Sequence, residues 1–262
     1  MILRRITEHV KAQNWFAVGI DFLIVIVGVF IGTNVTNWND ARLTQERSAA
    51  YTERLLNDLQ VEHEYAVSLR EYFEDARQAS IIAFNGLTGT GEHDDREILI
   101  NIFRASQFQW YERRSAAFNE LLSSGELGLI KDPVFRETAV KFYSNSANVF
   151  DINRTSAQSS EFRQLVDEII DPNVRLALRA ACGDKEYMTA ADVSGLFTIG
   201  YACKIDNVDA EIVQKTVDAF RADPMTLRAL RRQSASFDVN VFNIDYMLDL
   251  SGLSVLFQEQ GE

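Results

Sequence analysis

The side chains that most often carry enzyme chemistry are sparse in this 262-residue chain. Its three histidines are His9, His63 and His93, and none has the HExxH spacing that places two imidazoles around a zinc ion. Cys182 and Cys203 lie 21 positions apart with no CxxC pair, which is a poor pattern for zinc. The sequence therefore predicts no metal site.

Two clusters of polar and aromatic residues remain as candidates for chemistry. Glu62-His63-Glu64 sets carboxyl groups beside an imidazole. Adjacent residues of a helix do not face each other, so we interpret this triplet as part of a solvated helix face. Trp110-Tyr111, followed by Arg113-Arg114, is open to two interpretations: a surface that stacks a ligand, or an aromatic turn packed on the protein.

Motifs for nucleophilic catalysis and nucleotide binding are absent from the sequence, which has no Gly-x-Ser-x-Gly, Walker or dinucleotide fingerprint. The run Thr88-Gly89-Thr90-Gly91 lacks the Gly-Lys-Ser/Thr that completes a phosphate-binding loop. The acidic groups at 92–95 and 206–211 do not fit the register of a calcium loop. We therefore predict no catalytic residue, no cofactor and no enzyme activity.

One segment, from Trp15 to Trp38, is apolar and long enough to cross a membrane. As a helix it would span roughly 36 Å, slightly more than the hydrocarbon core of a bilayer. Trp15 and Trp38 bracket it where amphipathic rings anchor a helix at the two interfaces. A cleaved signal peptide is the alternative, but the residues that follow offer no Ala-x-Ala cleavage site. We predict a transmembrane helix over 15–38.

Three residues inside this segment are candidates for contacts with another chain. Gly28 and Gly32 form a GxxxG pair, which lets two helix backbones approach closely. Asp21 lies roughly 8 Å from the middle of the span, where an ionisable group costs on the order of 1–3 kcal/mol unless it finds a partner, binds a proton or reaches the interface. We predict contact with another membrane protein, or self-association, through these residues. The alternative for Asp21 is a side chain that extends to the membrane surface.

The charges that flank the segment predict its orientation. Arg4, Arg5 and Lys11 precede it, whereas basic and acidic residues are mixed just after it. The positive-inside rule then places residues 1–14 in the cytoplasm and residues 39–262 in the periplasm, with the helix in a bacterial inner membrane.

The cysteine-containing segment 181–207 loses helical periodicity, so we expect it to be irregular, with a short helix near 190–197. An even number of cysteines is typical of an oxidising compartment. A disulfide between Cys182 and Cys203 would stabilise the fold by about 3 kcal/mol. Two unpaired buried thiols are the alternative.

Composition favours helices and excludes one class of partner. The chain is 47% hydrophobic and has only three prolines, so few residues would interrupt a helix. Its net charge is −12, which repels nucleic acid, so we expect no nucleic-acid partner.

Apolar residues recur at three- and four-residue spacing after the membrane segment and predict a long helix over 39–85. Asp132, Asp171 and Asp223 each precede a proline, and this pair is typical of the first positions of a helix. Further helices are expected over the following ranges: about 94–106, from about 113, 133 onward, 152–170, from 172, and 224–258. The predicted fold class is all-α, with an extramembrane bundle of five to seven helices whose two long helices, 39–85 and 224–258, lie antiparallel.

Two stretches resemble a family of uncharacterised bacterial single-pass membrane proteins. The first is Val-Gly-Val-Phe-Ile-Gly at 27–32 with Asn-Trp-Asn-Asp at 37–40, and the second is Leu-Ser-Ser-Gly at 122–125 with Leu-Ile-Lys-Asp at 129–132. The resemblance implies one membrane helix followed by a helical region, and it implies no activity. Gly-Ile-Asp-Phe-Leu at 19–23 also resembles the membrane helix of short subunits of proton-driven motors, the biopolymer-transport and flagellar stator proteins.

These observations favour a membrane-anchored, non-enzymatic helical bundle that acts as an interaction or accessory subunit of a membrane complex. Two other hypotheses stay open. A periplasmic sensor or ligand-binding domain would need a pocket in the bundle, and a stator-like ion-coupled subunit would use Asp21.

Overall fold

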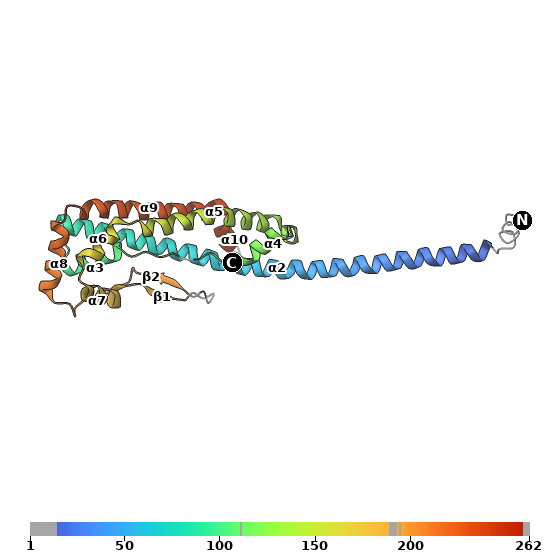
Figure 1. The fold of residues 1–262 in the computed structure, drawn as a ribbon, viewed down its shortest axis with the longest axis horizontal. Helices are drawn as coiled ribbons and strands as arrows, with labels where there is room; N and C mark the ends of the chain where they lie inside the picture. The colour runs from blue at the N-terminus through green and yellow to red at the C-terminus, as the bar shows by residue number, and fades with distance from the viewer. Residues whose placement is uncertain (1–14, 111, 189–192, 194, 259–262) are drawn as a thin grey trace, which may run out of the picture. The chain divides into compact units, whose positions relative to one another are not determined.

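A computed structural model describes residues 15–110, 112–188, 193 and 195–258 of the chain (Figure 1). The predicted cytoplasmic segment 1–14 lies outside the described residues. The chain divides into two compact units, Met1–Thr52 and Glu53–Glu262. Helix α2 (Trp15–Thr88) contributes residues to both, so the predicted membrane helix and the predicted helix over 39–85 are one continuous element.

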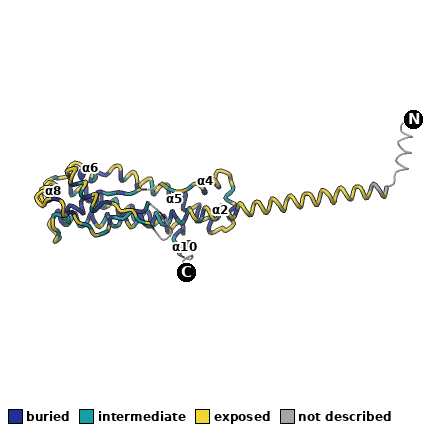
Figure 2. Tube along the Cα trace, turned by 90° about the horizontal axis from the view of Figure 1, so that it is seen from below, coloured by how far each residue is buried: buried dark blue, intermediate teal, exposed yellow. Residues whose placement is uncertain are grey.

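Helix α2 contains the segment that is long and apolar enough to span a membrane. Its most apolar window has a mean hydropathy of 1.9, and none of that window is buried within the chain. Figure 2 colours this part of α2 as exposed along its length. The helix ends at Thr88, where Gly89 takes a φ of 69° that other residues rarely adopt.

The second unit is a mainly helical bundle, and the chain is mostly helical as predicted. After α2, the helices of this unit follow in the order α3 (Asp95–Ala105), α4 (Ala116–Ser123), the 3₁₀ turn η1 (Leu127–Leu129), α5 (Pro133–Gln158), α6 (Glu161–Ile169), α7 (Pro172–Cys182), α8 (Ala210–Ala222), α9 (Thr226–Ser251) and α10 (Leu253–Gln258). Figure 1 shows α5 and α9 side by side above the C-terminal part of α2.

The apolar spacing predicted for α2 is the spacing of its buried residues. Leu55, Leu59, Ala66, Phe73 and Ala76 are all fully buried. The Phe73 ring packs on Phe108, with centroids 5.0 Å apart, and on Phe237 of α9, with centroids 6.1 Å apart. This helix therefore supplies the centre of the core, because one stripe of its surface is covered along several turns.

Contacts between α2 and α9 follow opposite chain order. Arg70 pairs with Asp245 at 2.6 Å, Arg77 lies 3.6 Å from Asp238, and the Arg231 guanidinium lies over the Phe84 ring at 5.0 Å. As the residue number rises along α2, the number of its neighbour on α9 falls.

Two of the three predicted aspartate–proline helix starts are confirmed. Asp132 accepts the backbone N–H groups of Val134 and Phe135, and Asp171 accepts that of Asn173, so each carboxylate caps the first turn. The third start is displaced, because Asp223 accepts the Met225 N–H within a turn and α9 begins at Thr226.

Other predicted boundaries need correction. The helix predicted over 152–170 is instead the end of α5 and a separate α6, because Ser160 is extended and its hydroxyl caps α6. The helix predicted over 224–258 breaks at Gly252, whose φ of 74° ends α9 before α10. Helix α8 was not predicted.

The all-α prediction is also incomplete, because a β-hairpin lies between α7 and α8. Strand β1 (Lys185–Tyr187) pairs antiparallel with β2 (Leu196–Thr198), so 181–207 is not wholly irregular. The short helix expected near 190–197 falls partly on residues outside the description, and its last two positions belong to β2. Leu196 is buried in the hairpin's small core with Val61 and Val193, and this contact with α2 has no local sequence signal.

Candidate functional site

The apolar part of α2 is exposed on every side. The side chains from Phe22 to Ile31 are all exposed, and no described residue covers them. Trp38 is 69% exposed, and Trp15 begins the helix, although its side chain is outside the description. An apolar surface of this kind is stable in water only when something covers it, and a bilayer is the environment that its length fits.

Asp21, Gly28 and Gly32 share one face of this helix. Residues seven and eleven positions apart in an α-helix return to within about 20° of the same direction. Asp21 is exposed, and a Cβ added at either Gly28 or Gly32 would meet no atom of the chain within 4 Å. Gly19 points to nearly the opposite side. The three predicted contact residues therefore form one face that is free of contacts within the described structure, called the Asp21 face below.

Polar side chains at the end of the apolar segment bond to the helix itself. Thr33 Oγ1 and Asn34 Nδ2 donate to the Phe30 carbonyl at 3.0 and 2.7 Å, and Thr36 Oγ1 donates to the Gly32 carbonyl at 3.0 Å. Such bonds satisfy polar groups within the helix, which lowers the cost of placing them near hydrocarbon.

In the bundle, the interpretation of Glu62-His63-Glu64 as a solvated face was wrong. Glu62 has no exposed surface, and its Oε1 accepts the backbone N–H of Arg114. His63 is half-buried beside the Phe257 ring, with centroids 5.5 Å apart, and this burial lowers the pKa of its imidazole. The error arose because the segment that covers this face of α2 comes from 52 positions away in the sequence.

A second carboxylate strengthens this attachment. Asp58, one turn before Glu62, accepts the backbone N–H of Ala117 in the first turn of α4, and burial raises the pKa of its carboxyl group. Arg54, a further turn back, pairs with Glu120 at 3.2 Å. Asp58 and Glu62 of α2 therefore hold the start of α4 and the residues just before it in place.

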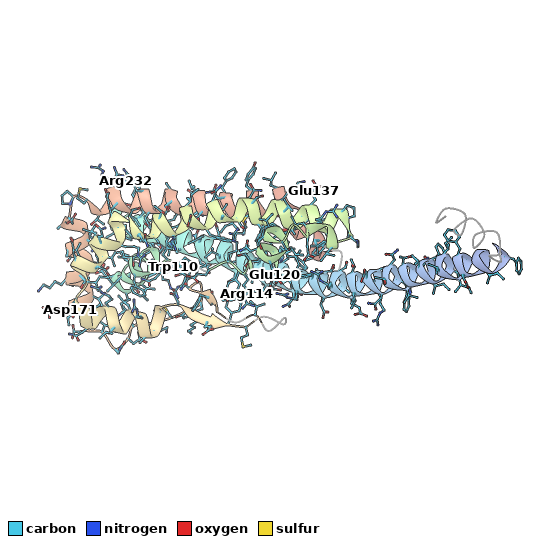
Figure 3. All side chains as sticks on the ribbon, turned by 45° about the vertical axis from the view of Figure 1, so that its right-hand side comes forward. Trp110, Arg114, Glu120, Glu137, Asp171 and Arg232 are labelled. Atoms are coloured by element: carbon cyan, nitrogen blue, oxygen red, sulfur yellow. A yellow bond between two sulfur atoms is a disulfide. The ribbon has the colours of Figure 1, made fainter. Side chains whose placement is uncertain are left out.

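Trp110 lies in the segment of the chain between α3 and α4 (Figure 3). It is half exposed, and the space between it, Tyr72 and Phe197 is about 20 Å³, which admits little more than a water molecule. Trp110 and Arg113 also line a second hollow, of about 250 Å³. Arg113 itself donates to the Tyr143 carbonyl and to Ser146 Oγ. Tyr111 lies outside the described residues.

Cys182 and Cys203 form a disulfide, with their Cα atoms 5.4 Å apart. Arg104 of α3 donates to the Tyr201 carbonyl and to Cys203 Sγ at 3.3 Å, and Arg96 donates to the Ile205 carbonyl at 2.7 Å. A cleft of about 500 Å³ lies between α3 and this segment. Both arginines line this cleft, as do Lys204 and Asp206, so its walls carry charges of both signs.

Among the described residues, no group of three or more His, Cys, Asp or Glu side chains could hold a metal ion. No protein-family model matches this chain, nor does any curated protein or solved structure. Its function is therefore inferred from the chemistry and geometry of its own residues.

Proposed function

We propose that this protein is a membrane-anchored, non-enzymatic helical bundle that acts as an interaction or accessory subunit of a membrane complex. The observation that carries this proposal is the Asp21 face. A carboxyl group and two glycines share one side of an otherwise apolar exposed helix. In a bilayer, close backbone contact at Gly28 and Gly32 favours a neighbouring helix, and Asp21 gains from a polar partner there.

We further propose a bacterial inner-membrane location with the N-terminus in the cytoplasm and the bundle in the periplasm. Arg4, Arg5 and Lys11 before the segment support this orientation. The disulfide supports an oxidising compartment for the bundle. The opposite order of contacts along α2 and α9 supports an antiparallel spine for that bundle.

The experiment compares association of the full-length chain in native membranes with that of two face variants. Chemical cross-linking and mild detergent extraction, followed by affinity purification, would recover the wild-type chain with a second membrane protein or a second copy. Gly28→Ile with Gly32→Ile inserts side chains where backbones would meet, so we expect at least a tenfold loss of the cross-linked species. Asp21→Asn tests the polar contact separately.

Gly19→Ile is the matched control, because Gly19 is also exposed on this helix but on the opposite side. It adds one isoleucine side chain of the same kind and should leave association unchanged. A wild-type chain recovered alone as a monomer would refute the proposal, as would equal association of the Gly28/Gly32 variant and wild type. Intact assembly of Asp21→Asn together with a lost cellular phenotype would instead favour the stator-like, ion-coupled role.

A further inference from the structure

The cleft between α3 and the segment 201–206, called the α3 cleft below, has two ends that differ in charge. Its two walls run in opposite directions, because Arg96 in the first turn of α3 donates to the Ile205 carbonyl, whereas Arg104 in the last turn donates to the Tyr201 carbonyl. The first and last turns of α3 are about 10 Å apart along the helix axis. The cleft has a volume of about 500 Å³, which is within the range of small-ligand sites.

The end beside the first turn of α3 is acidic. Asp94, Glu97 and Asp206 line it, together with the single arginine Arg96. Asp94 accepts a backbone N–H as the cap of α3, and Glu97 lies 3.0 Å from His93 Nδ1, so both carboxylates already have a contact. The Asp206 side chain is exposed and forms no hydrogen bond or ion pair with a described residue. Asp206 is therefore the carboxylate that is available to a positively charged group.

The end beside the last turn of α3 is basic, because Arg104 lines it and the acidic lining residues all lie at the other end. Arg104 is partly buried, and its guanidinium donates to two uncharged acceptors, the Tyr201 carbonyl and Cys203 Sγ. Burial lowers the pKa of Arg104, although Asp75, which does not line the cleft, attracts it. A cation that has lost water without gaining an ion pair is stabilised when an anionic group reaches it.

Between these ends, the cleft offers both apolar and hydrogen-bonding surface. Ile82 and Ile100 line it. Asn101 is only 8% exposed, and its Nδ2 donates to the Glu97 carbonyl at 2.8 Å, which leaves its Oδ1 as an acceptor for an N–H group. Lys204 is exposed on the opposite wall. The middle of the cleft thus fits a molecule that is partly apolar and carries amide groups.

We propose that the α3 cleft binds a short peptide whose two ends are free. The terminal ammonium group contacts Asp206, the terminal carboxylate contacts Arg104, and an amide N–H donates to Asn101. Three extended residues span about 10 Å, which matches the separation of the two ends of the cleft. This site lies outside the Asp21 face, so it adds a ligand-binding role to the proposed interaction subunit.

Calorimetric titration of the full-length chain in detergent with trialanine tests the proposal. For a ligand of this size we expect a Kd on the order of 0.3 mM. N-acetyl-trialanine lacks the ammonium group and trialanine amide lacks the carboxylate, so each should bind about tenfold more weakly. Dialanine is too short to reach both ends and should bind as weakly as the capped peptides. Non-specific attraction to a chain of net charge −12 would instead strengthen the binding of the more positive trialanine amide.

Matched variants assign the two contacts. Asp206→Asn should weaken trialanine binding about threefold and leave N-acetyl-trialanine binding unchanged. Arg104→Gln should weaken trialanine binding about tenfold and leave trialanine amide binding unchanged. Asp249→Asn is the control, because it removes a negative charge from an exposed position of α9 and should bind trialanine as the wild type does. The peptide series and Asp206→Asn retain the bonds that Arg104 makes to the chain, so they test the site even where Arg104→Gln fails to fold.

Three results would each overturn the proposal. The first is no binding of trialanine to the wild type at concentrations up to about 10 mM, well above the expected Kd. The second is a capped peptide that binds as tightly as trialanine. The third is a loss of affinity in Asp249→Asn equal to that in Asp206→Asn.

Discussion

Two buried asparagines make the sharpest stability prediction, because their amide groups have no hydrogen-bond partner among the described residues. Asn153 of α5 is 1% exposed and Asn240 of α9 is 0% exposed. Near the C-terminal end of α5, the Ser160 hydroxyl donates to Gln233 of α9 at 2.6 Å. Near the C-terminal end of α9, Gly252 lies close to Thr138 of α5. Interpolation between these two contacts places Asn153 level with Asn240.

The magnitude follows from the four polar atoms of this pair. Neither Nδ2 nor Oδ1 of either residue has a hydrogen-bond partner among the described residues. A buried polar group without a partner costs about 1–3 kcal/mol. In the double variant Asn153→Ala with Asn240→Leu, the combined side-chain volume is nearly conserved, which limits cavity and overpacking costs. Allowing for residual misfit, we expect a gain of about 2 kcal/mol in the free energy of unfolding.

The assay is thermal and urea unfolding of the full-length chain in detergent, followed by circular dichroism. A gain of this size would raise the Tm by roughly 4–8 °C. Asn148→Ala, on the exposed side of α5, is the matched control for the change in helix propensity and should stay within about 0.5 kcal/mol of wild type. A double variant no more stable than this control would show that the two amides are satisfied in the folded protein, and would refute the reasoning.

Two further predictions concern the cysteine-containing segment and its neighbours. The double variant Cys182→Ala with Cys203→Ala should lower the free energy of unfolding by about 3 kcal/mol, because the disulfide restricts the unfolded chain. Reduction of the wild-type protein should lower the midpoint of its urea unfolding by a similar amount. An unchanged urea midpoint in both experiments would contradict a stabilising role for the disulfide. Burial raises the pKa of Asp75 above the usual carboxyl value of 3.8, despite its hydrogen bond from the Gly200 N–H and its attraction to Arg104. The folded state then binds a proton more readily than the unfolded state, so this residue's contribution to stability should rise as the pH falls from neutral and level off below 3.8. Asp75→Asn should remove this pH dependence, because an asparagine does not titrate. The difference in free energy of unfolding between variant and wild type should therefore shrink as the pH falls. A difference that stays the same at every pH would contradict the raised pKa of Asp75.

Several features of the candidate membrane site could be predicted from the sequence because they are local. The apolar length of 15–38 and the shared side of Asp21, Gly28 and Gly32 depend only on helix geometry.

The sequence by itself determined the long α2 helix, its buried stripe and the helix starts at Pro133 and Pro172. Periodicity and capping act within a few residues, so these signals survive without the fold. Tertiary structure decided which side of each helix is covered. It buried Glu62 under a segment distant in sequence, formed the β-hairpin against α2, set Asn153 level with Asn240, and left Phe242 and Tyr246 of α9 exposed. Such outcomes depend on which distant surfaces meet, and a helical period alone cannot distinguish a stripe that faces the core from one that faces a partner.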